Sequence, residues 1–225
     1  MHFLLVNDDG IGSVGIMALM EAALKRGHRV SMCAPSGQMS AASHRITLSD
    51  PLYVKDYPLN RENAEGFAIT GTPADCVRLA FLGGLVAESV DGVISGINNG
   101  YNAGLATYYS GTVGAAREGA LLGYPAIAAS IDYKADPAHV QDAAELVLAV
   151  AEKYCQAPQD GFRVLNINVP DLPRARWGAP VYAPLSRRQS GTATSAAMLT
   201  GLAPISGFRR AVRWIPPPRA ATNGI

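Results

Sequence analysis

His-Phe-Leu-Leu-Val-Asn-Asp-Asp-Gly-Ile-Gly-Ser-Val-Gly, residues 2–15, begins as a short apolar run and ends in a polar turn. An unbroken run such as Phe3–Val6 is typical of a strand buried on both faces of a parallel sheet. Asp8 and Asp9 follow at once, and in open α/β sheets the ligand crevice lies at the carboxyl ends of the strands. Adjacent carboxylates there repel each other and lose hydration, and a divalent cation relieves both costs. The stretch therefore predicts a metal or catalytic site, with a solvated turn as the plainer alternative.

Length and composition bound the remaining possibilities. The chain has 225 residues, of which 48% are hydrophobic, and this fits one α/β domain or one domain with an appended arm. With 19 basic and 18 acidic side chains, charge gives no case for nucleic acid or a membrane surface as the main partner. Cys33, Cys76 and Cys155 are scattered without a CxxC pair, as is typical of buried thiols in a reducing compartment. We see no signal peptide or membrane span and expect a cytoplasmic protein.

Hydrophobic spacing predicts helices and strands that alternate along the chain. Residues 13–26 carry apolar side chains at helical spacing, with Ser13 as N-cap and Gly27 as the stop. A strand over 29–34 completes a βαβ unit, so the sheet is expected to be parallel. Residues 46–70 hold short β-like pieces between turn residues, which predicts an antiparallel excursion. The later elements expected are a helix opening at Thr72, a strand over 91–98, a helix opening at Ser110, a strand over 124–130, a helix over 137–154 and a strand over 162–169.

This order of elements indicates the α/β class, as a Rossmann-like three-layer sandwich with a mostly parallel sheet. We assign residues 1–170 to this catalytic domain. From residue 171 onward Pro, Arg, Gly and Ser become common and regular periodicity fades. We interpret residues 171–225 as an extended C-terminal arm that contacts a neighbouring subunit or stays partly disordered.

The loop over residues 35–45 contributes candidate site residues at the end of the second strand. Ser40 or Ser43 could supply a neutral oxygen beside the aspartates, although for this stretch by itself a mobile loop is the better interpretation. His44 could act as a general base, although a lone histidine in a loop is more often solvated.

Two further polar stretches follow the strand predicted over 91–98. The Gly- and Asn-rich loop 99–104 can offer amide oxygens to a metal and backbone N–H groups to an anion. Ser110, Gly111 and Thr112 open a helix of small residues, and a helix N-terminus with two hydroxyls suits a phosphate group. The alternative for this second stretch is an ordinary N-cap with tight helix packing.

Gly10, Gly12 and Gly15 match the GxGxxG fingerprint of dinucleotide-binding proteins, after a strand and at the start of a helix. This leaves a nicotinamide-dependent oxidoreductase as an alternative function. Against it, the aspartates before Gly10 would face the pyrophosphate, and the second strand ends without an acidic residue for the ribose. The sequence also has no GxxxxGK[ST] loop, so a P-loop enzyme is not indicated.

Five motifs follow one another between residues 6 and 119. They are Val6-Asn7-Asp8-Asp9-Gly10; Ala34-Pro35 followed by Ser40 and Ala42-Ser43; Gly71-Thr72-Pro73-Ala74-Asp75-Cys76-Val77; Ser95-Gly96-Ile97-Asn98; and Tyr109-Ser110-Gly111-Thr112-Val113 followed by Ala115-Ala116-Arg117-Glu118-Gly119. In this combination the chain resembles the SurE proteins, the stationary-phase survival nucleotidases, over about residues 1–170.

The resemblance implies a metal-dependent phosphomonoesterase that hydrolyses nucleoside 5′-monophosphates, with 3′-monophosphates and short polyphosphate left open as further substrates. It implies one divalent cation per subunit, Mg²⁺ or Mn²⁺, and a homodimer or homotetramer assembled partly through exchanged C-terminal segments. The implied metal ligands are Asp8, Asp9, Ser40 and Asn98. The implied phosphate-binding residues are Asn102, Ser110, Gly111 and Thr112.

Asp8 and Asp9 are the candidate catalytic residues, and we take Asp9 as the general base toward water, with a covalent aspartate left open. A non-catalytic nucleotide-binding module with the same residues remains a second alternative. The chain departs from the family pattern in the loop 36–41, where Gln38 takes the place of an asparagine. Residues 201–205 are only a shortened match to the family's closing strand.

Overall fold

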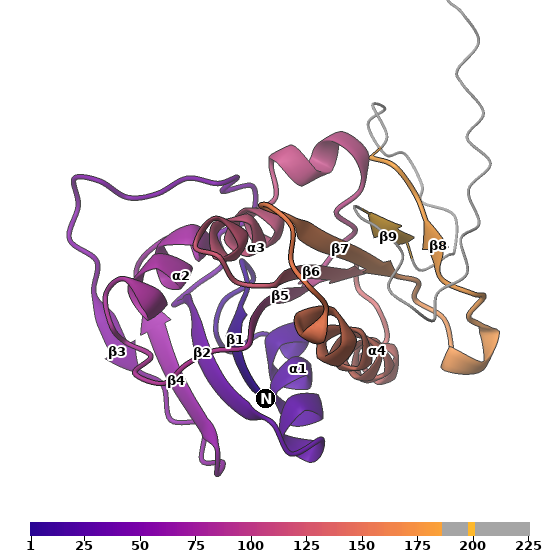
Figure 1. Ribbon diagram of the computed structural model, residues 1–225, viewed down its shortest axis with the longest axis horizontal. Helices are drawn as coiled ribbons and strands as arrows, with labels where there is room; N and C mark the ends of the chain where they lie inside the picture. The colour runs from indigo at the N-terminus through magenta and orange to yellow at the C-terminus, as the bar shows by residue number, and fades with distance from the viewer. Residues whose placement is uncertain (186–197, 201–225) are drawn as a thin grey trace, which may run out of the picture.

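The computed structural model describes residues 1–185 and the backbone of residues 198–200. Within these residues the chain forms a nine-stranded sheet flanked by helices (Figure 1). The strands are β1 (His2–Val6), β2 (Arg29–Pro35), β3 (Val54–Asp56), β4 (Ala64–Ile69), β5 (Gly92–Asn99), β6 (Ala126–Ile131), β7 (Val164–Val169), β8 (Val181–Tyr182) and β9 (Met198–Thr200). The helices are α1 (Val14–Lys25), α2 (Pro73–Phe81), α3 (Gly111–Leu121) and α4 (Pro137–Gln156), with short 3₁₀ turns η1 (Gly104–Tyr108) and η2 (Arg174–Arg176).

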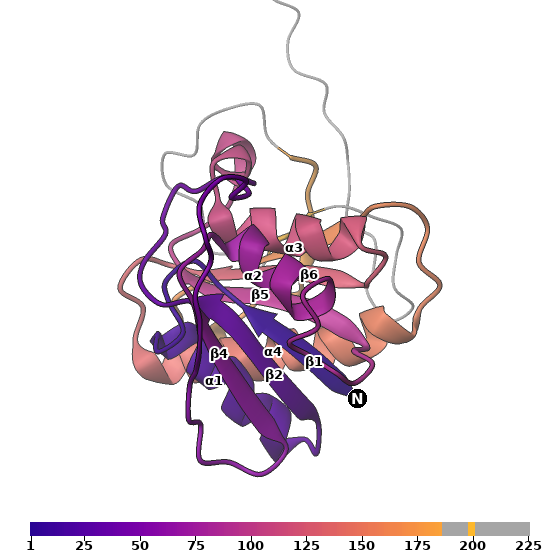
Figure 2. The ribbon, with the colours of Figure 1, turned by 90° about the vertical axis from the view of Figure 1, so that its left-hand side faces the viewer.

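The sheet has the strand order β3-β4-β2-β1-β5-β6-β7-β9-β8. All neighbours from β4 to β7 pair in parallel. Helices α1 and α4 lie against one face of the sheet, and α2 and α3 lie against the other (Figure 2). The predicted three-layer α/β sandwich with a mostly parallel sheet is therefore confirmed.

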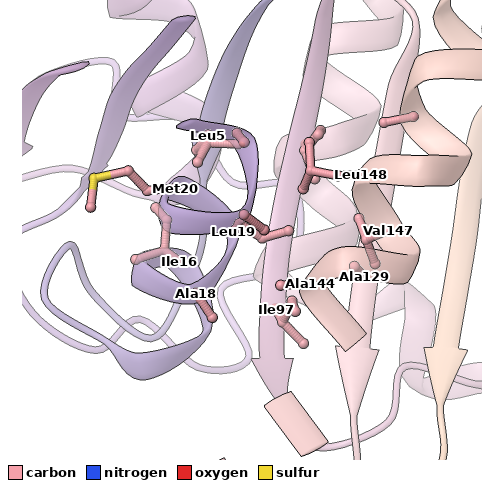
Figure 3. Close-up of a cluster of buried hydrophobic side chains, with 14 of the residues drawn as sticks. Leu5, Ile16, Ala18, Leu19, Met20, Ile97, Ala129, Ala144, Val147 and Leu148 are labelled. Atoms are coloured by element: carbon pink, nitrogen blue, oxygen red, sulfur yellow. The ribbon is translucent and has the colours of Figure 1, made fainter. Parts of the chain in front are cut away.

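Strand β1 is buried on both faces, as its apolar run predicts. Phe3 and Leu5 face the core formed with α1 and α4, whereas Leu4 and Val6 face the core formed with α2 and α3. Figure 3 shows the first of these cores, to which α1 contributes Leu19 and α4 contributes Leu148. This burial holds the end of β1, and with it the aspartates, at the centre of the sheet.

Local sequence signals set the helix boundaries. Thr72 and Asp75 form a reciprocal capping box at the start of α2, and Ser110 caps α3 by accepting from the backbone N–H of Val113. Gly27 follows α1 with φ of +77° and ends it, as predicted. Ser13 occupies the N-cap position of α1, but its side chain makes no capping bond there.

The excursion over residues 46–70 is antiparallel only in part. Strand β3 pairs antiparallel with β4, but β4 itself runs parallel to β2. The connection from β2 to β4 contains no helix among its described residues. It is nevertheless long enough to bring the chain back to the end of the sheet at which β2 begins, and parallel pairing requires this return. The segment 46–48, predicted as a β-like piece, is not a strand.

The edge of the sheet beyond β7 is formed by the first part of the predicted arm. Strand β9 pairs antiparallel with β7, and β8 pairs with β9. Residues 186–197 and 201–225, including the segment 201–205, lie outside the described residues, so a subunit contact through the arm stays a prediction. None of the helices in the described ranges is long and apolar enough to cross a bilayer.

Candidate metal and phosphate site

The candidate site lies next to β1, at the point where the strand order of the sheet reverses. From β1 the chain passes through α1 to β2 on one side, and after α2 it returns to β5 on the other side. Such a switch point opens a crevice at the carboxyl ends of the two strands. Asp8 and Asp9 follow β1 at this edge, and Asn98 and Asn99 end β5 beside them.

Asn7 shapes the turn that carries the two aspartates. Its side chain is fully buried, and its amide nitrogen donates to the carbonyl of Gly10 at 2.8 Å and to Ser13 Oγ at 2.7 Å. Asn7 Oδ1 accepts from the Gly10 N–H at 3.2 Å, and Gly10 has φ of +99°. The Asn-x-x-Gly spacing is the sequence signal that could have revealed this role, because asparagine side chains commonly close such turns.

Asp8 lies against the N-terminus of α3. Its side chain is 4% exposed, and Oδ1 accepts a 2.5 Å hydrogen bond from the hydroxyl of Thr112. A Cβ on Gly111 would lie 2.9 Å from both Cβ and Oδ2 of Asp8, so only glycine allows this approach. The carboxylate and the helix terminus are therefore in direct contact.

Asp9 is half-buried and turns toward β5, where its Oδ2 accepts from the backbone N–H of Asn99 at 3.1 Å. Burial raises the pKa of both carboxyls, and for Asp8 the neighbouring Asp9 charge adds to this, against the lowering effect of Thr112. No basic group of the described residues contributes to either shift. The pair thus presents negative charge that a cation would stabilise.

The loop that follows β2 is fastened to the aspartate turn. The backbone N–H of Met39 donates to the carbonyl of Asp8 at 2.7 Å, which brings Ser40 next to the site. Ser40 is exposed, and its Oγ accepts from Gln38 Nε2 at 3.0 Å. Ser43 instead donates to the carbonyl of Tyr108 at 2.7 Å. Of the two serines left open by the residues alone, Ser40 is the one that directly follows the Met39 contact with the aspartate turn.

His44 anchors this loop on α3. Its Nε2 lies 2.7 Å from Oε2 of Glu118, a carboxylate that is 4% exposed and whose other oxygen accepts from Arg78 at 2.9 Å. Gly114 packs beside it, since a Cβ there would lie 2.2 Å from the carbonyl oxygen of Ser43. Neither the general-base nor the solvated interpretation of His44 describes this hydrogen bond, which sequence reasoning missed.

The residues after β5 form two groups. Asn98 donates from Nδ2 to the carbonyl of Gly100 at 2.6 Å, which leaves its Oδ1 as the atom that could ligate a cation. Asn102 is buried, and its Nδ2 donates to Ser130 Oγ at 2.9 Å. One amide hydrogen of Asn102 is thus committed to the fold, and a second remains for a ligand.

The backbone of Asn102 is held by two asparagines of β7. Its N–H donates to Asn168 Oδ1 at 2.9 Å, and its carbonyl accepts from Asn166 at 2.8 Å and from Asn168 at 3.0 Å. The alternation of asparagine with apolar residues inside a buried strand was the available signal for this cluster. It fixes the path of the chain between β5 and α3.

Two glycines of the GxGxxG match, Gly10 and Gly15, are required by the fold. A Cβ on Gly15 would lie 1.9 Å from the carbonyl oxygen of Ile97, so α1 approaches β5 closely only because residue 15 is glycine. Gly10 needs its positive φ for the aspartate turn. These contacts explain the motif without a dinucleotide and disfavour the oxidoreductase alternative.

A cation at this site would rely on neutral oxygens as well as carboxylates. In the ranges that the structure describes, no three or more His, Cys, Asp or Glu side chains form a group that could hold a metal. Two carboxylates, a serine hydroxyl and an asparagine amide nevertheless supply hard oxygen donors of the kind that Mg²⁺ prefers. The residues present therefore fit a divalent cation bound through oxygen.

Comparison with known proteins gives one consistent answer. The family model described as Survival protein SurE matches residues 3–192. A protein named 5′-nucleotidase SurE from Desulfitobacterium hafniense is 43% identical over 183 residues, which are 79% of this chain and 67% of that protein. One of the same name from Solidesulfovibrio magneticus is 46% identical over 178 residues, 78% of this chain and 67% of that protein. The crystal structure of the SurE protein from Aquifex aeolicus aligns with a TM-score of 0.72 at 35% identity, over 84% of this chain and 73% of that chain. On these matches and on the fold, the chain belongs to the SurE family.

Proposed function

We propose that this chain is a metal-dependent 5′-nucleotidase that hydrolyses nucleoside 5′-monophosphates to nucleoside and phosphate. The observation that carries this is the contact of the buried Asp8 carboxylate with Gly111 and Thr112 at the start of α3. A cation held by carboxylates would there lie next to a helix N-terminus, whose free N–H groups favour anions. The names of the relatives, 5′-nucleotidase SurE, support the same reaction.

One divalent cation per subunit, Mg²⁺ or Mn²⁺, would be held by Asp8, Asp9, Ser40 and Asn98. The bound ion would neutralise phosphate charge and lower the pKa of a water molecule. Asp8 is oriented by Thr112, and Asp9 by the backbone of Asn99. These second contacts fix the carboxylates before substrate arrives, which reduces the reorganisation needed for the reaction.

The phosphoryl oxygens would lie on the first turn of α3. The backbone N–H groups of Gly111 and Thr112 belong to that turn, where helical N–H groups have no partner within the helix. The Thr112 hydroxyl is engaged with Asp8, so we assign phosphate binding to its N–H and carboxylate positioning to its hydroxyl. Ser110 and the second amide hydrogen of Asn102 complete the proposed set.

Asp9 is the better candidate for general base. Its carboxylate accepts one backbone hydrogen bond and is half-buried, whereas the carboxylate of Asp8 is enclosed and already bonded to Thr112.

The test is phosphate release from 5′- and 3′-nucleoside monophosphates and tripolyphosphate, with Mg²⁺ or Mn²⁺ and again after EDTA. We expect metal-dependent release from the 5′-monophosphates, and loss of at least about 10³-fold in kcat for Asp8→Asn and Asp9→Asn. Asp56→Asn, at an exposed position of β3, is the matched control. Metal-dependent nucleotide binding without release would instead indicate the non-catalytic module.

Assembly is proposed separately. We infer a homodimer or homotetramer in which residues 171–225 contribute to the subunit contact. Light scattering on the full chain and on a variant ending at residue 185 tests this. If the removed residues form the subunit contact, the full chain will have the mass of an oligomer and the shortened chain the mass of a monomer.

A further inference from the structure

The start of α2 carries the motif Gly71-Thr72-Pro73-Ala74-Asp75-Cys76-Val77, none of whose residues belongs to the proposed ligand set. Within the capping box, one oxygen of the Asp75 carboxylate accepts from the backbone N–H of Thr72 at 2.9 Å. The carboxylate has further partners, and the side chain is only 2% exposed. Because a buried carboxylate is stable only when hydrogen bonds satisfy it, these partners show what Asp75 holds in place.

The further partners of Asp75 lie at the end of the Ser40 loop, defined as residues 36–47. The N–H of Thr47 donates to Asp75 Oδ1 at 2.9 Å, and the Thr47 hydroxyl donates to Oδ2 at 2.7 Å. The Thr72 hydroxyl accepts from the N–H of Asp75 at 3.2 Å and donates to the carbonyl of Arg45 at 2.6 Å. Burial raises the pKa of Asp75, but the hydrogen bonds from Thr47 and Thr72 outweigh it and lower the pKa below its ordinary value. An ionised carboxylate therefore fastens this end of the loop to α2.

The Ser40 loop is fixed at its other end to the aspartate turn. There the N–H of Met39 donates to the carbonyl of Asp8 at 2.7 Å. Between the two ends, Ala41 and Ser43 have φ of +57° and +56°, a left-handed conformation that costs free energy for residues other than glycine. Such conformations persist where surrounding contacts enforce them. The path of the chain through Ser40 therefore depends on the contacts that hold the loop.

The start of α2 also packs against the first turn of α3. A Cβ on Gly111 would lie 3.1 Å from Cγ of Pro73, and both helices lie on the same face of the sheet (Figure 2). A Cβ on Gly71 would lie 2.9 Å from Cβ of Asp75 and 3.1 Å from its Oδ2, so the glycine leaves room for the carboxylate. The motif thus joins the Ser40 loop to the helix that bears the proposed phosphate-binding residues.

We propose that Asp75 is a positioning residue for cation binding, which holds the Ser40 loop against the aspartate turn and so keeps Ser40 in place as a ligand. The inference rests on the proposed metal-dependent function and extends it to a residue outside the ligand set. If Asp75 served only to cap α2, removal of its contact with the loop would leave the cation affinity unchanged.

The contact with the loop can be removed without touching the capping box. Thr47→Val deletes the hydroxyl that donates to Asp75 and keeps the backbone N–H contact, whereas Thr47→Ser retains the hydroxyl. Thr70→Val is the matched control, because its exposed hydroxyl oxygen accepts from the N–H of Tyr53 at 2.9 Å, outside the Ser40 loop. Asp75→Asn weakens both contacts. If this last variant fails to fold by circular dichroism, Thr47→Val decides.

Calorimetric titration with Mn²⁺ measures the effect on the site. We expect Thr47→Val to bind Mn²⁺ about tenfold more weakly, within the range for residues that act on a site without touching its ligand. The His44 contact still anchors the loop, so the affinity is reduced and not lost. Thr47→Ser and Thr70→Val should bind as wild type, and kcat for 5′-AMP at saturating Mn²⁺ should be nearly unchanged in all three variants. Wild-type affinity in a folded Thr47→Val would overturn the inference.

Two further measurements show whether the effect passes through the loop to Ser40. In a Ser40→Ala background, Thr47→Val should cause no additional loss of Mn²⁺ affinity, because the ligand that it positions is already absent. A second tenfold loss there would contradict the assignment. In EDTA, the amide of Met39 should exchange its hydrogen faster in Thr47→Val than in wild type or Thr70→Val. Equal exchange in all three proteins would also contradict it.

These measurements separate the inference from the proposed function. A wild-type protein that binds Mn²⁺ but hydrolyses no nucleoside monophosphate would refute the function, and the affinities of the variants would still test Asp75. Hydrolysis by the wild type, with equal Mn²⁺ affinity in wild type and Thr47→Val, would refute the inference alone. A wild-type protein that does not bind Mn²⁺ would contradict both.

Discussion

The hydroxyl of Thr112, in the first turn of α3, donates a 2.5 Å hydrogen bond to Asp8 Oδ1 across 104 residues of sequence. This bond joins the end of β1 to the helix that supplies the proposed phosphate cradle. It fixes one oxygen of the carboxylate and directs the other toward the crevice side of Gly111, whose missing side chain makes room for it.

Removing this hydroxyl should weaken metal binding without unfolding the protein. Thr112→Val keeps the shape of the side chain but leaves Asp8 without its partner, and loss of such a supporting contact typically costs about 10- to 100-fold in metal affinity or activity. Calorimetric titration with Mn²⁺ and steady-state kinetics with 5′-AMP measure both effects. Thr112→Ser, which retains the donor, should stay close to wild type; an unchanged affinity in Thr112→Val would show that the bond does not position the ligand.

Removing the charge of Asp8 should stabilise the metal-free protein while abolishing activity. Burial and the neighbouring Asp9 raise the pKa of Asp8, so the folded state prefers the protonated form and loses stability as the pH rises through that pKa. At pH 7 in EDTA the carboxylate is therefore a cost, and Asp8→Asn should melt higher, by about 2–4 °C for each kcal/mol relieved.

Adding Mn²⁺ should reverse this order. The wild-type protein gains stability because the ion binds only the folded state, whereas Asp8→Asn gains little. Thermal melts of both proteins in EDTA and in Mn²⁺ provide the comparison. A variant that melts lower than wild type in EDTA would mean that Asp8 stabilises the fold without a metal.

The His44–Glu118 hydrogen bond should act on the metal site through the Ser40 loop. His44→Ala removes the loop anchor, so Ser40 is held less firmly, and we expect metal affinity to fall by about tenfold with a smaller change in kcat at saturating metal. Arg45→Ala, at the exposed neighbouring side chain, is the control. His44→Gln, which can still donate to Glu118, should restore part of the affinity. A lower melting temperature with unchanged metal affinity would restrict the pair to a structural role.

Acid should weaken the contact between the end of α1 and α4. Hydrogen bonds from Arg26, and then from His28, lower the pKa of Glu152 to about 2, with Arg26 Nη2 at 2.6 Å and His28 Nε2 at 2.7 Å. Because the folded-state pKa lies below the ordinary value of 4.5, this stabilisation is complete above about pH 4.5 and disappears as the pH falls toward 2.

Glu152→Gln should therefore lower the free energy of unfolding at pH 6 by on the order of 1 kcal/mol, after allowance for solvent screening of a partly exposed group. The difference from wild type should shrink between pH 4.5 and pH 2.5 in urea unfolding. Glu62→Gln, at an exposed position, serves as control. A difference that stays constant over this pH range would assign the effect to packing.

The alternating elements of the sandwich were predictable from the sequence because their signals are local. Apolar runs identified β1 and β5, helical spacing identified α1 and α4, and Thr72 with Asp75 marked the start of α2 within four residues. The strand pairing within residues 46–70 was harder to predict. Strand β4 pairs with β2, and no local sequence pattern indicates which strand of a sheet another strand will join.

The sequence by itself determined the fold class, the family resemblance and the residue types of the candidate site, since each of these depends on composition and short-range spacing. Tertiary structure decided the contacts between distant segments: Thr112 with Asp8, His44 with Glu118, and the β7 asparagines with Asn102. The physical reason is that strand order and register fix which side chains meet, and these follow from burial of the whole sheet rather than from any one segment.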